Sequence, residues 1–279
     1  MSSDNIADQL VYATTKIKCT GSSIISEGTG FFFQKDLSNG KTVFALVTNN
    51  HVVEGFNKAE IYLAGVNSDG TPNDQNKVEI SISDLQMKRV RHPSPDIDIC
   101  LLIIGDDINQ ARSEGKAVYY KTIPSTMIPS EDLLAQMSPI EDVIMVGYPN
   151  GLMDSYNNKP IIRKGITASN VKLDYENRPD FLVDMACFWG SSGSPVFIRT
   201  ESPGFTSSGN GTVSLAKSIH YYLGGILHSG PVRKMDGSIL IKDVPTALTP
   251  YAEFELPLNL GYITKAKKIV EIFDVFFKV

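Results

Sequence analysis

Cysteine is scarce in this chain, with three among 279 residues. Cys19, Cys100 and Cys187 are an odd set, and their spacing gives no disulfide framework of the kind found in small secreted domains. The first ten residues lack a basic segment followed by an apolar run, so they do not predict a secretory signal peptide. No stretch approaches the roughly 18 uninterrupted apolar residues of a membrane span. We therefore expect a cytoplasmic protein that does not bind a membrane.

Positive charge is not in excess either. Lys and Arg number 26 against 31 Asp and Glu, which gives a formal net charge of −5. Proteins that bind nucleic acid usually carry a basic face, so we expect no nucleic-acid partner. The sequence has no internal repeats, and it implies neither a metal nor a cofactor.

Short apolar or alternating runs separated by turn residues predict two sets of strands. The first set lies at 12–19, 29–34, 43–48, 60–63, 78–82, 87–91 and 97–104, and the second at 143–148, 161–169, 181–187, 195–200 and 221–228. Many short strands at such spacing are typical of β-barrels. The polar and mixed stretch between the sets, with a predicted short helix at 108–114, marks the expected domain junction.

Three later segments differ from these strands in composition. Residues 202–211 are rich in Ser and Gly and predict a flexible loop. Residues 231–257 are longer than a simple hairpin, and either a lid over a substrate site or a surface excursion without a role in binding would account for them. Residues 262–279 carry apolar side chains at helical spacing, which predicts a C-terminal helix that packs on the protein rather than on a membrane surface.

Three short motifs carry the chemistry that the residues themselves suggest. Gly-Ser-Ser-Gly-Ser-Pro at 190–195 places a serine between small residues after an apolar run. A nucleophilic serine needs backbone N–H groups that converge on the oxyanion, and adjacent glycines let the backbone adopt that shape. Thr-Asn-Asn-His at 48–51 and Asp-Ile-Cys-Leu-Leu at 98–102 supply a histidine and a carboxylate upstream. The chain order is therefore histidine, aspartate, serine.

These motifs resemble those of the chymotrypsin-like, or trypsin-fold, serine proteases, which read Thr-Ala-x-His, Asp-Ile-Ala-Leu-Leu and Gly-Asp-Ser-Gly-Gly-Pro in the same order. The resemblance implies an all-β fold of two six-stranded antiparallel β-barrels followed by a C-terminal α-helix. On this basis we expect an N-terminal barrel at 1–118, a C-terminal barrel at 119–261 and a C-terminal helix packed on the barrels at 262–279. The active site of this family lies in the cleft between the barrels.

The resemblance also implies a role for each candidate residue. His51 would take the proton from the Ser192 hydroxyl and return it to the leaving amine, since an imidazole pKa of about 6.5 lies near neutral pH. Asp98 would accept the N–H of His51 and hold its tautomer. Asp96 is the competing carboxylate, but Asp98 is preferred because it directly precedes the Ile-x-Leu-Leu sequence. The backbone N–H groups of Gly190 and Ser192 would form the oxyanion hole.

The sequence departs from the digestive members of the family at Ser191, where they have the aspartate that captures a new N-terminus after zymogen cleavage. That activation switch therefore cannot operate, and the motif form is most similar to that of bacterial glutamyl endopeptidases and trypsin-like peptidases. Ala186 is at a position that lines the base of the primary pocket in relatives, so no acidic floor would select Lys or Arg. Trp189 would either overhang the substrate cleft or serve as a buried anchor. His228 would support Asp98 or contribute to substrate selectivity, and its register favours support.

The sequence thus predicts a serine endopeptidase that cleaves a peptide or protein substrate through an acyl-enzyme intermediate. Three alternatives for control of this activity stay open. They are a regulatory protein partner, substrate-induced ordering of 231–257, and no control at all. A catalytically silent module that captures peptides in the same cleft is one rival function. A cysteine peptidase that uses Cys187 is another, but this cysteine lacks flanking glycines and fits a buried apolar residue better.

Overall fold

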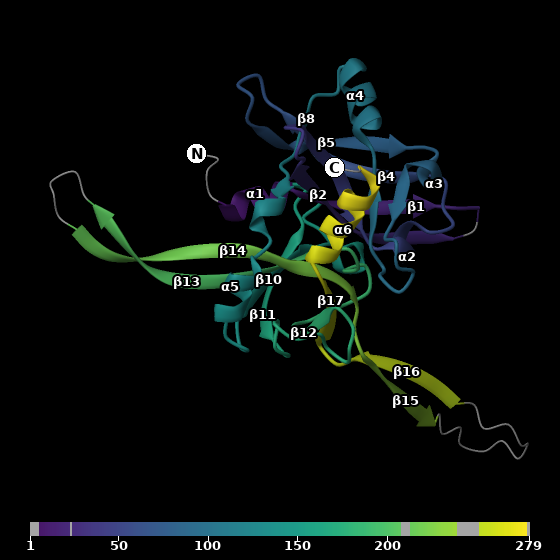
Figure 1. Cartoon of the computed structure of the whole chain (residues 1–279). Helices are drawn as coiled ribbons and strands as arrows, with labels where there is room; N and C mark the ends of the chain where they lie inside the picture. Colours follow the sequence, from purple (N-terminus) through teal and green to yellow (C-terminus); the bar gives the residue numbers. More distant parts are fainter. Residues whose placement is uncertain (1–5, 23, 208–212, 239–250, 278–279) are drawn as a thin grey trace, which may run out of the picture.

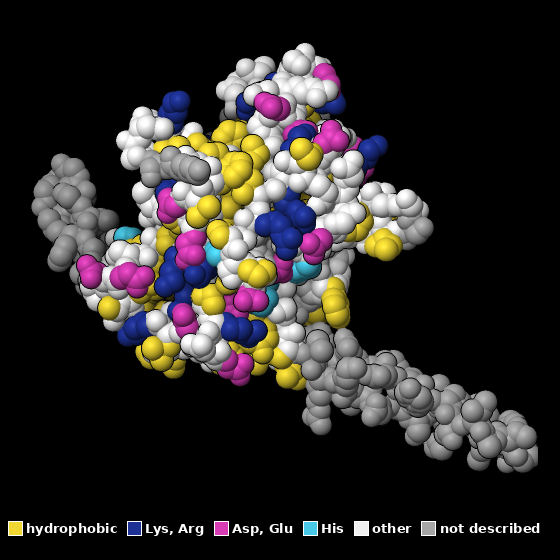
Figure 2. Space-filling view, turned by 45° about the vertical axis from the view of Figure 1, so that its right-hand side comes forward, with side chains coloured by type: hydrophobic (Ala, Val, Ile, Leu, Met, Phe, Trp, Pro, Cys, Tyr) yellow, Lys and Arg dark blue, Asp and Glu magenta, His cyan; other side chains and the backbone are white. Residues whose placement is uncertain are grey.

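The structure is a computed structural model that describes residues 6–22, 24–207, 213–238 and 251–277. Strands dominate it, arranged as an N-terminal sheet, a C-terminal closed barrel and a separate two-stranded hairpin (Figure 1). No described helix is long and apolar enough to cross a membrane. On the face shown in Figure 2, Lys and Arg side chains are interspersed with Asp and Glu rather than gathered in one basic patch.

The N-terminal sheet has nine strands. They are β1 (Thr14–Thr20), β2 (Ile25–Asp36), β3 (Thr42–Thr48), β4 (Ala59–Val66), β5 (Pro72–Ile82), β6 (Arg89–Arg91), β7 (Cys100–Leu102), β8 (Val118–Tyr119) and β9 (Ile123–Pro124). The order is β5-β4-β1-β2-β3-β7-β6, with β8 paired to β4 and β9 paired to β2. Helices α1 (Ile6–Tyr12), α2 (Asn50–Val53), α3 (Leu85–Lys88) and α4 (Gly105–Ser113) accompany it.

The C-terminal barrel has six strands and is closed. They are β10 (Asp142–Gly147), β11 (Ile161–Thr167), β12 (Asp180–Asp184), β13 (Pro195–Ser207), β14 (Val213–Ser229) and β17 (Leu260–Lys265). Their order is β10-β11-β12-β17-β14-β13, and antiparallel pairing of β13 with β10 closes the ring. The remaining helices are η1 (Ser125–Met127), α5 (Glu131–Gln136), η2 (Pro149–Gly151) and α6 (Lys267–Phe276).

Three consecutive phenylalanines on β2 join the two halves of the molecule. Successive side chains of a strand point to opposite faces, and Phe31, Phe32 and Phe33 are all fully buried. Phe32 packs in the core of the N-terminal sheet, whereas Phe31 and Phe33 belong to a second core shared with barrel residues such as Phe197. Burial of one such ring contributes about 1.5–3 kcal/mol. The shared core therefore holds the sheet against the barrel, while a third core fills the barrel itself.

Helix α6 packs on the protein through its apolar side. Ile269, Ile272 and Phe273 are buried in the core shared by sheet and barrel. The Phe273 ring centroid lies 5.5 Å from that of Phe33 on β2. The helical spacing of apolar residues at the C-terminus is thus explained by contact with the N-terminal sheet.

The fold class is confirmed in part, as a mostly β protein with one closed six-stranded antiparallel barrel. The N-terminal sheet has nine strands rather than six, and its closure into a second barrel stays a prediction. Since β8 and β9 pair with β4 and β2, this sheet extends beyond the expected boundary at residue 118. The expected helix at 262–279 was wrong at its start, because β17 pairs with β12 as far as Thr264 and with β14 as far as Lys265. The helix begins at Lys267.

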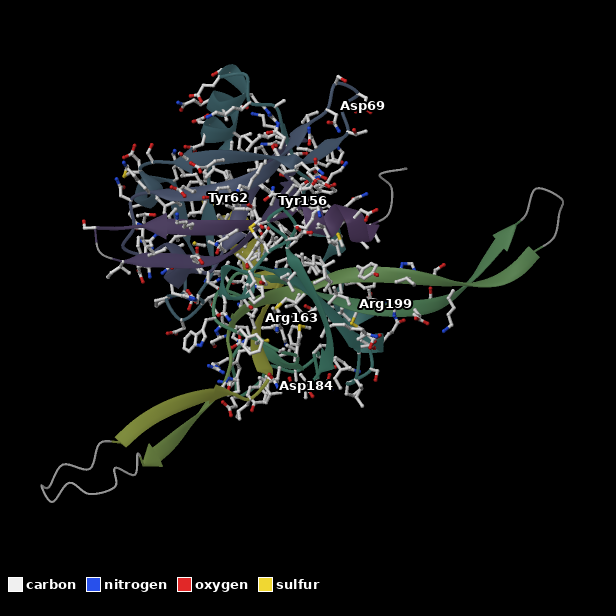
Figure 3. The ribbon with its side chains drawn as sticks, turned by 180° about the vertical axis from the view of Figure 1, so that it is seen from behind. Tyr62, Asp69, Tyr156, Arg163, Asp184 and Arg199 are labelled. Atoms are coloured by element: carbon white, nitrogen blue, oxygen red, sulfur yellow. The ribbon has the colours of Figure 1, made fainter. Side chains whose placement is uncertain are left out.

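Two hairpins extend beyond the sheets. β13 runs to Ser207 and pairs with β14, so the expected loop at 202–211 is strand over its first part, and its remainder lies outside the described residues. β15 (Val232–Ser238) and β16 (Tyr251–Pro257) form a two-stranded sheet of their own. This hairpin points away from the barrel in Figures 1 and 3. A lid role for 231–257 stays a prediction, and residues 239–250 of this segment lie outside the described residues.

Candidate active site

The pairing of β3 with β7 brings the histidine and aspartate motifs together. These strands are antiparallel, with Thr48 opposite Cys100. The residues that follow β3 and those that precede β7 therefore leave the sheet at the same edge. His51 lies there in the short helix α2, and Asp98 lies two residues before β7.

Two hydrogen bonds join His51 to Asp98. The distance from His51 Nδ1 to Asp98 Oδ2 is 2.5 Å, and the backbone N–H of His51 donates to Asp98 Oδ1 at 3.1 Å. The Asn49 side chain donates to the Asp98 carbonyl oxygen at 2.6 Å. Asp96 has no hydrogen bond to His51 among the described residues. With Nδ1–H directed at the carboxylate, Nε2 of His51 is left as the proton acceptor.

Two glycines with positive φ shape the loop that carries Ser192. Gly190 has φ +79° and Gly193 has φ +87°, a region that side chains other than hydrogen rarely allow. A Cβ on Gly193 would lie 1.9 Å from the Thr29 carbonyl oxygen, and one on Gly190 would lie 2.9 Å from the Tyr148 carbonyl oxygen. Both positions therefore need glycine for conformation and for space.

The amides of this loop divide into bonded and free groups. Those of Ser191, Gly193 and Ser194 donate to the carbonyl oxygens of Phe188, Leu227 and Ser191, respectively. The amides of Gly190 and Ser192 donate to no carbonyl or side chain among the described residues. A free N–H group on the serine itself and another two residues before it match the requirement of an oxyanion hole.

Thr29 on β2 links the loop to the rest of the site, and sequence reasoning missed this role. Its amide donates to the Ser192 carbonyl oxygen at 2.8 Å, and its hydroxyl donates to the Gly190 carbonyl oxygen at 3.3 Å. The same hydroxyl accepts the Tyr148 amide at 3.0 Å. The Thr48 hydroxyl donates to the Thr29 carbonyl oxygen at 2.7 Å. One fully buried threonine thus contacts both the histidine motif and the serine motif.

A pocket of about 430 Å³ lies between the N-terminal sheet and the barrel, and both His51 and Ser192 line it. Residues 25–27 of β2 line it from the sheet, and residues 187–190 and 227–231 line it from the barrel. The Ser192 hydroxyl donates to the His228 carbonyl oxygen at 3.4 Å. The structure therefore brings His51 and Ser192 to one cleft, and Asp98 is bonded to His51 without lining this pocket. The Ser192 hydroxyl is turned toward the His228 carbonyl oxygen.

A family model described as the trypsin-like peptidase domain matches residues 28–202, which is more than half of the chain. The chain belongs to this trypsin-like peptidase family. The matched range contains the motifs of His51, Asp98 and Ser192, and it ends before β14 and the C-terminal helix.

Solved structures of proteases are similar to this chain at low identity. One is catalytically inactive tobacco etch virus protease complexed with substrate (9% identity, 97% of this chain and 86% of that chain, TM-score 0.47). Others are the thermostable serine protease AL20 from an extremophilic microorganism (11%, 95% and 96%, 0.46) and the scabies mite inactivated protease paralogue S-I1 (14%, 96% and 95%, 0.45). These TM-scores are below 0.5, so the family assignment rests on the family model. Curated proteins gave no match.

The His228 side chain is bonded to Asp180 rather than to Asp98. Its Nε2 lies 3.3 Å from Asp180 Oδ2, and its Nδ1 lies 2.9 Å from the Ser229 hydroxyl. The expected support of Asp98 by this side chain is therefore not observed. The pairing of β14 with β17 shifts register between Leu227 and Ser229, and such a bulge re-aims the side chain within it.

Asp180 is held ionised by this arrangement. Burial alone would raise the pKa of Asp180, but hydrogen bonds from His228 and Thr264 and the charges of His228 and Arg178 outweigh it. The pKa of Asp180 is therefore held below its usual range. The His228 imidazole is thus anchored to a buried carboxylate.

Of the expected specificity residues, Trp189 lines the pocket and Ala186 precedes the segment that lines it. Trp189 is 69% exposed and lines the pocket, which excludes its reading as a buried anchor. The Ala186 carbonyl oxygen accepts a hydrogen bond from Arg163, a barrel residue on β11 labelled in Figure 3. The Arg163 guanidinium also lies 4.7 Å from the centroid of the Phe188 ring, which lines the pocket. Arg163 therefore contacts Phe188 of the pocket wall and the backbone of the neighbouring Ala186.

Cys187 is buried, although it lies at the edge of the same pocket. Burial raises the pKa of the Cys187 thiol to about 11. A cysteine nucleophile reacts as the thiolate, and a thiol with such a pKa is protonated near neutral pH. The environment of Cys187 therefore disfavours a cysteine peptidase mechanism at this residue.

Proposed function

We propose that this chain is a serine endopeptidase that uses His51, Asp98 and Ser192. The observation that carries the proposal is the 2.5 Å contact between His51 Nδ1 and Asp98 Oδ2 beside a pocket that Ser192 also lines. The free amides of Gly190 and Ser192 at the nucleophile add an oxyanion site. Membership of the trypsin-like peptidase family agrees with this chemistry.

The reaction would run in two halves. The Ser192 hydroxyl turns from the His228 carbonyl toward His51, and its proton passes to His51 Nε2 as Oγ bonds to the substrate carbonyl carbon. The oxyanion is stabilised by the two free amides, and Asp98 stabilises the imidazolium. The C–N bond then breaks, and His51 returns the proton to the leaving amine. Water repeats the sequence and releases the acid product with Ser192 restored.

A labelling experiment on the uncut full-length chain tests this proposal. A fluorophosphonate phosphonylates an activated serine, so wild type should be labelled at Ser192, with the site located by peptide mass spectrometry. Ser192→Ala and His51→Ala should not be labelled, because triad members act as a unit. Ser26→Ala is the matched control, since Ser26 lines the same pocket and should be dispensable. Folded wild type that takes no label would favour the silent peptide-binding module.

Substrate preference follows from the base of the pocket. Ala186 is at the position that lines this base in relatives, although it is not among the residues that line the present pocket, and it carries no carboxylate. We therefore propose cleavage of peptides or proteins without preference for Lys or Arg. A mixed peptide library treated with wild type and with Ser192→Ala would measure this preference. Cleavage confined to sites after Lys or Arg would refute the assignment of the pocket while leaving the triad intact.

We also propose a cytoplasmic location, with any control supplied by a protein partner. Support comes from Cys19, Cys100 and Cys187, which are free and buried. Alkylation of the unfolded chain without reductant should add three adducts. A mass two protons lighter with fewer adducts would indicate a disulfide and an oxidising compartment.

The uncut chain should not need zymogen cleavage, because Ser191 replaces the aspartate that captures a new N-terminus. Fluorophosphonate labelling that appears only after the N-terminus is trimmed would contradict this.

A further inference from the structure

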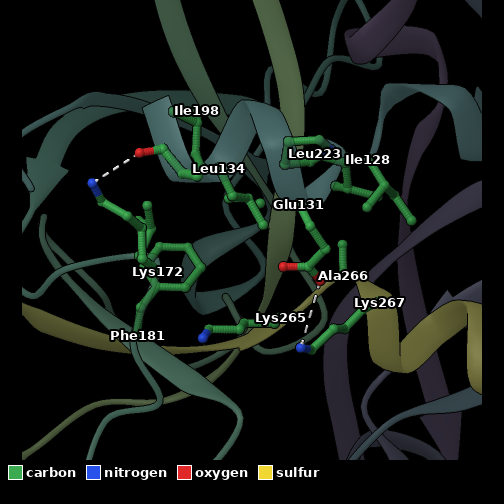
Figure 4. Close-up of a pocket in the computed structure, with 14 residues that line it drawn as sticks. Ile128, Glu131, Leu134, Lys172, Phe181, Ile198, Leu223, Lys265, Ala266 and Lys267 are labelled. Carbon is green, nitrogen blue, oxygen red and sulfur yellow. Dashed lines mark hydrogen bonds and ion pairs between the residues drawn. The ribbon is translucent and has the colours of Figure 1, made fainter. Parts of the chain in front are cut away.

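A second cavity lies away from the cleft, between the barrel wall, α5 and the start of α6 (Figure 4). Its volume is about 190 Å³. The described residues that line it are separate from those that line the active-site pocket. Whatever occupies this cavity therefore need not compete with a peptide substrate.

The floor of the cavity is apolar. Phe181, Ile198 and Leu223 come from three barrel strands and are almost completely buried, and Ile128 and Leu134 complete the apolar wall. A cavity of about 150 Å³ lined by Leu, Ile and Phe can stay free of water and bind benzene. The present cavity is of similar size, so it accommodates one aromatic ring or a short alkyl chain.

The rim of the cavity is cationic. Lys172, Lys265 and Lys267 line it, against the single carboxylate of Glu131. Lys172 donates to the Ala135 carbonyl oxygen, and among the described residues it has no carboxylate partner. Lys267 lies 4.0 Å from the exposed Glu131 carboxylate, a contact drawn in Figure 4.

Lys265 is paired with Asp174, which lies outside the lining. Lys265 is buried, and its ammonium also donates to the Leu173 carbonyl oxygen. The exposed charge at the rim is therefore that of Lys172 and Lys267 against Glu131, in a chain whose net charge is −5. The 10-residue helix α6 begins at this rim, and the positive end of its dipole reinforces the lysines. The local charge therefore favours an anion above an apolar floor.

We propose that this cavity binds a small amphiphilic carboxylate, with an aromatic ring or short alkyl chain on the Phe181 floor and the carboxylate at Lys172 and Lys267. The apolar group would leave water and contact the side chains of the floor. The carboxylate would stay at the exposed rim, where it gains charge-assisted hydrogen bonds without complete desolvation. This binding is independent of whether the chain is a peptidase.

Binding of 3-phenylpropanoate to the full chain, followed by saturation-transfer NMR and calorimetry, tests the proposal. The matched neutral and cationic probes are 3-phenylpropanol and 3-phenylpropylamine, which share the same ring and linker. The carboxylate should bind about fivefold more tightly than the alcohol, as expected for partly exposed ion pairs, and the amine should bind most weakly. All measurements are made on the Ser192→Ala chain, which removes covalent chemistry at the other pocket.

Variants assign the site. Lys172→Gln/Lys267→Gln should abolish the preference for the carboxylate over the alcohol, whereas Lys164→Gln, an exposed lysine on the same barrel, should retain it. Ala135→Phe places a ring in the cavity and should prevent binding of all three probes. The lysine variants are on the surface and keep the test informative if Ala135→Phe does not fold. Equal affinity for carboxylate and alcohol, no binding at millimolar concentration, or carboxylate preference unchanged in the double lysine variant would each overturn the proposal.

Discussion

Replacement of Thr29 by valine tests whether the loop that carries Ser192 depends on one buried hydroxyl. Valine has almost the same shape, so Thr29→Val removes the hydroxyl without leaving a cavity. The Tyr148 amide then loses its acceptor, and the Gly190 carbonyl oxygen loses its donor. The amide contacts of residue 29 itself remain. The change therefore isolates the hydrogen bonds that hold the peptide unit at the oxyanion site.

The structure sets the expected size of the effect. A buried amide left without an acceptor costs about 1–3 kcal/mol, and the lost bond to Gly190 adds about 0.5–1.5 kcal/mol. Since each kcal/mol lowers the Tm by roughly 2–4 °C in chains of this size, Thr29→Val should melt several degrees below wild type. Its labelling rate should also fall, but by less than the roughly 10²–10³-fold loss seen when an oxyanion donor is deleted outright.

Thermal melts and the rate of fluorophosphonate labelling of folded protein provide the two readouts. Thr29→Ser keeps the hydroxyl and should retain the labelling rate. Thr15→Val is the matched control, because the buried Thr15 hydroxyl likewise accepts an amide, that of Tyr62, within the N-terminal sheet. It should lower the Tm without slowing labelling. If Thr29→Val labels at the wild-type rate, the hydroxyl has no positioning role.

Three further changes have defined outcomes. Asp98→Asn should lower peptidase turnover by roughly 10⁴-fold through the wrong histidine tautomer, whereas Asp96→Asn should stay near wild type; the reverse result would reassign the carboxylate. Because the folded pKa of Asp180 is lowered, its stabilisation is present above about pH 4 and is lost as the pH falls through that lower pKa. The Tm difference between wild type and Asp180→Asn should therefore shrink on acidification, and a constant difference would contradict the pairing. Cys187→Ala should leave fluorophosphonate labelling intact, and loss of labelling in the folded variant would implicate the thiol.

The strands around the catalytic motifs could be predicted from sequence because their signals are local. β3 and β7 have short apolar runs bounded by polar residues, and the glycines at 190 and 193 mark a loop of unusual backbone shape. The order of the three motifs then suggested their association. The pairing of β3 with β7 supplies the physical reason for it, since the motif residues leave the sheet at one edge.

Other features could not be predicted because they depend on partners distant in sequence. Thr29 and Tyr148 are 119 residues apart, and no local pattern relates them. The sequence of β17 was included in the helix predicted for 262–279, because it is a strand through its pairing with β12 and β14 rather than through a local pattern. The orientation of His228 was misjudged for a similar reason, since a bulge against β17 shifts the simple alternation of faces.

The exposed position of Trp189 makes the cleft visible by fluorescence. It is the only tryptophan in the chain, and it lines the pocket with most of its side chain in contact with solvent. A bound peptide that covers the indole would shift its emission to shorter wavelength, so the intrinsic signal reports occupancy of this one site without a label. The same indole is a poor reporter of unfolding, because its surroundings are already aqueous in the native state. Emission from this protein therefore measures ligand binding, and melting needs a different probe.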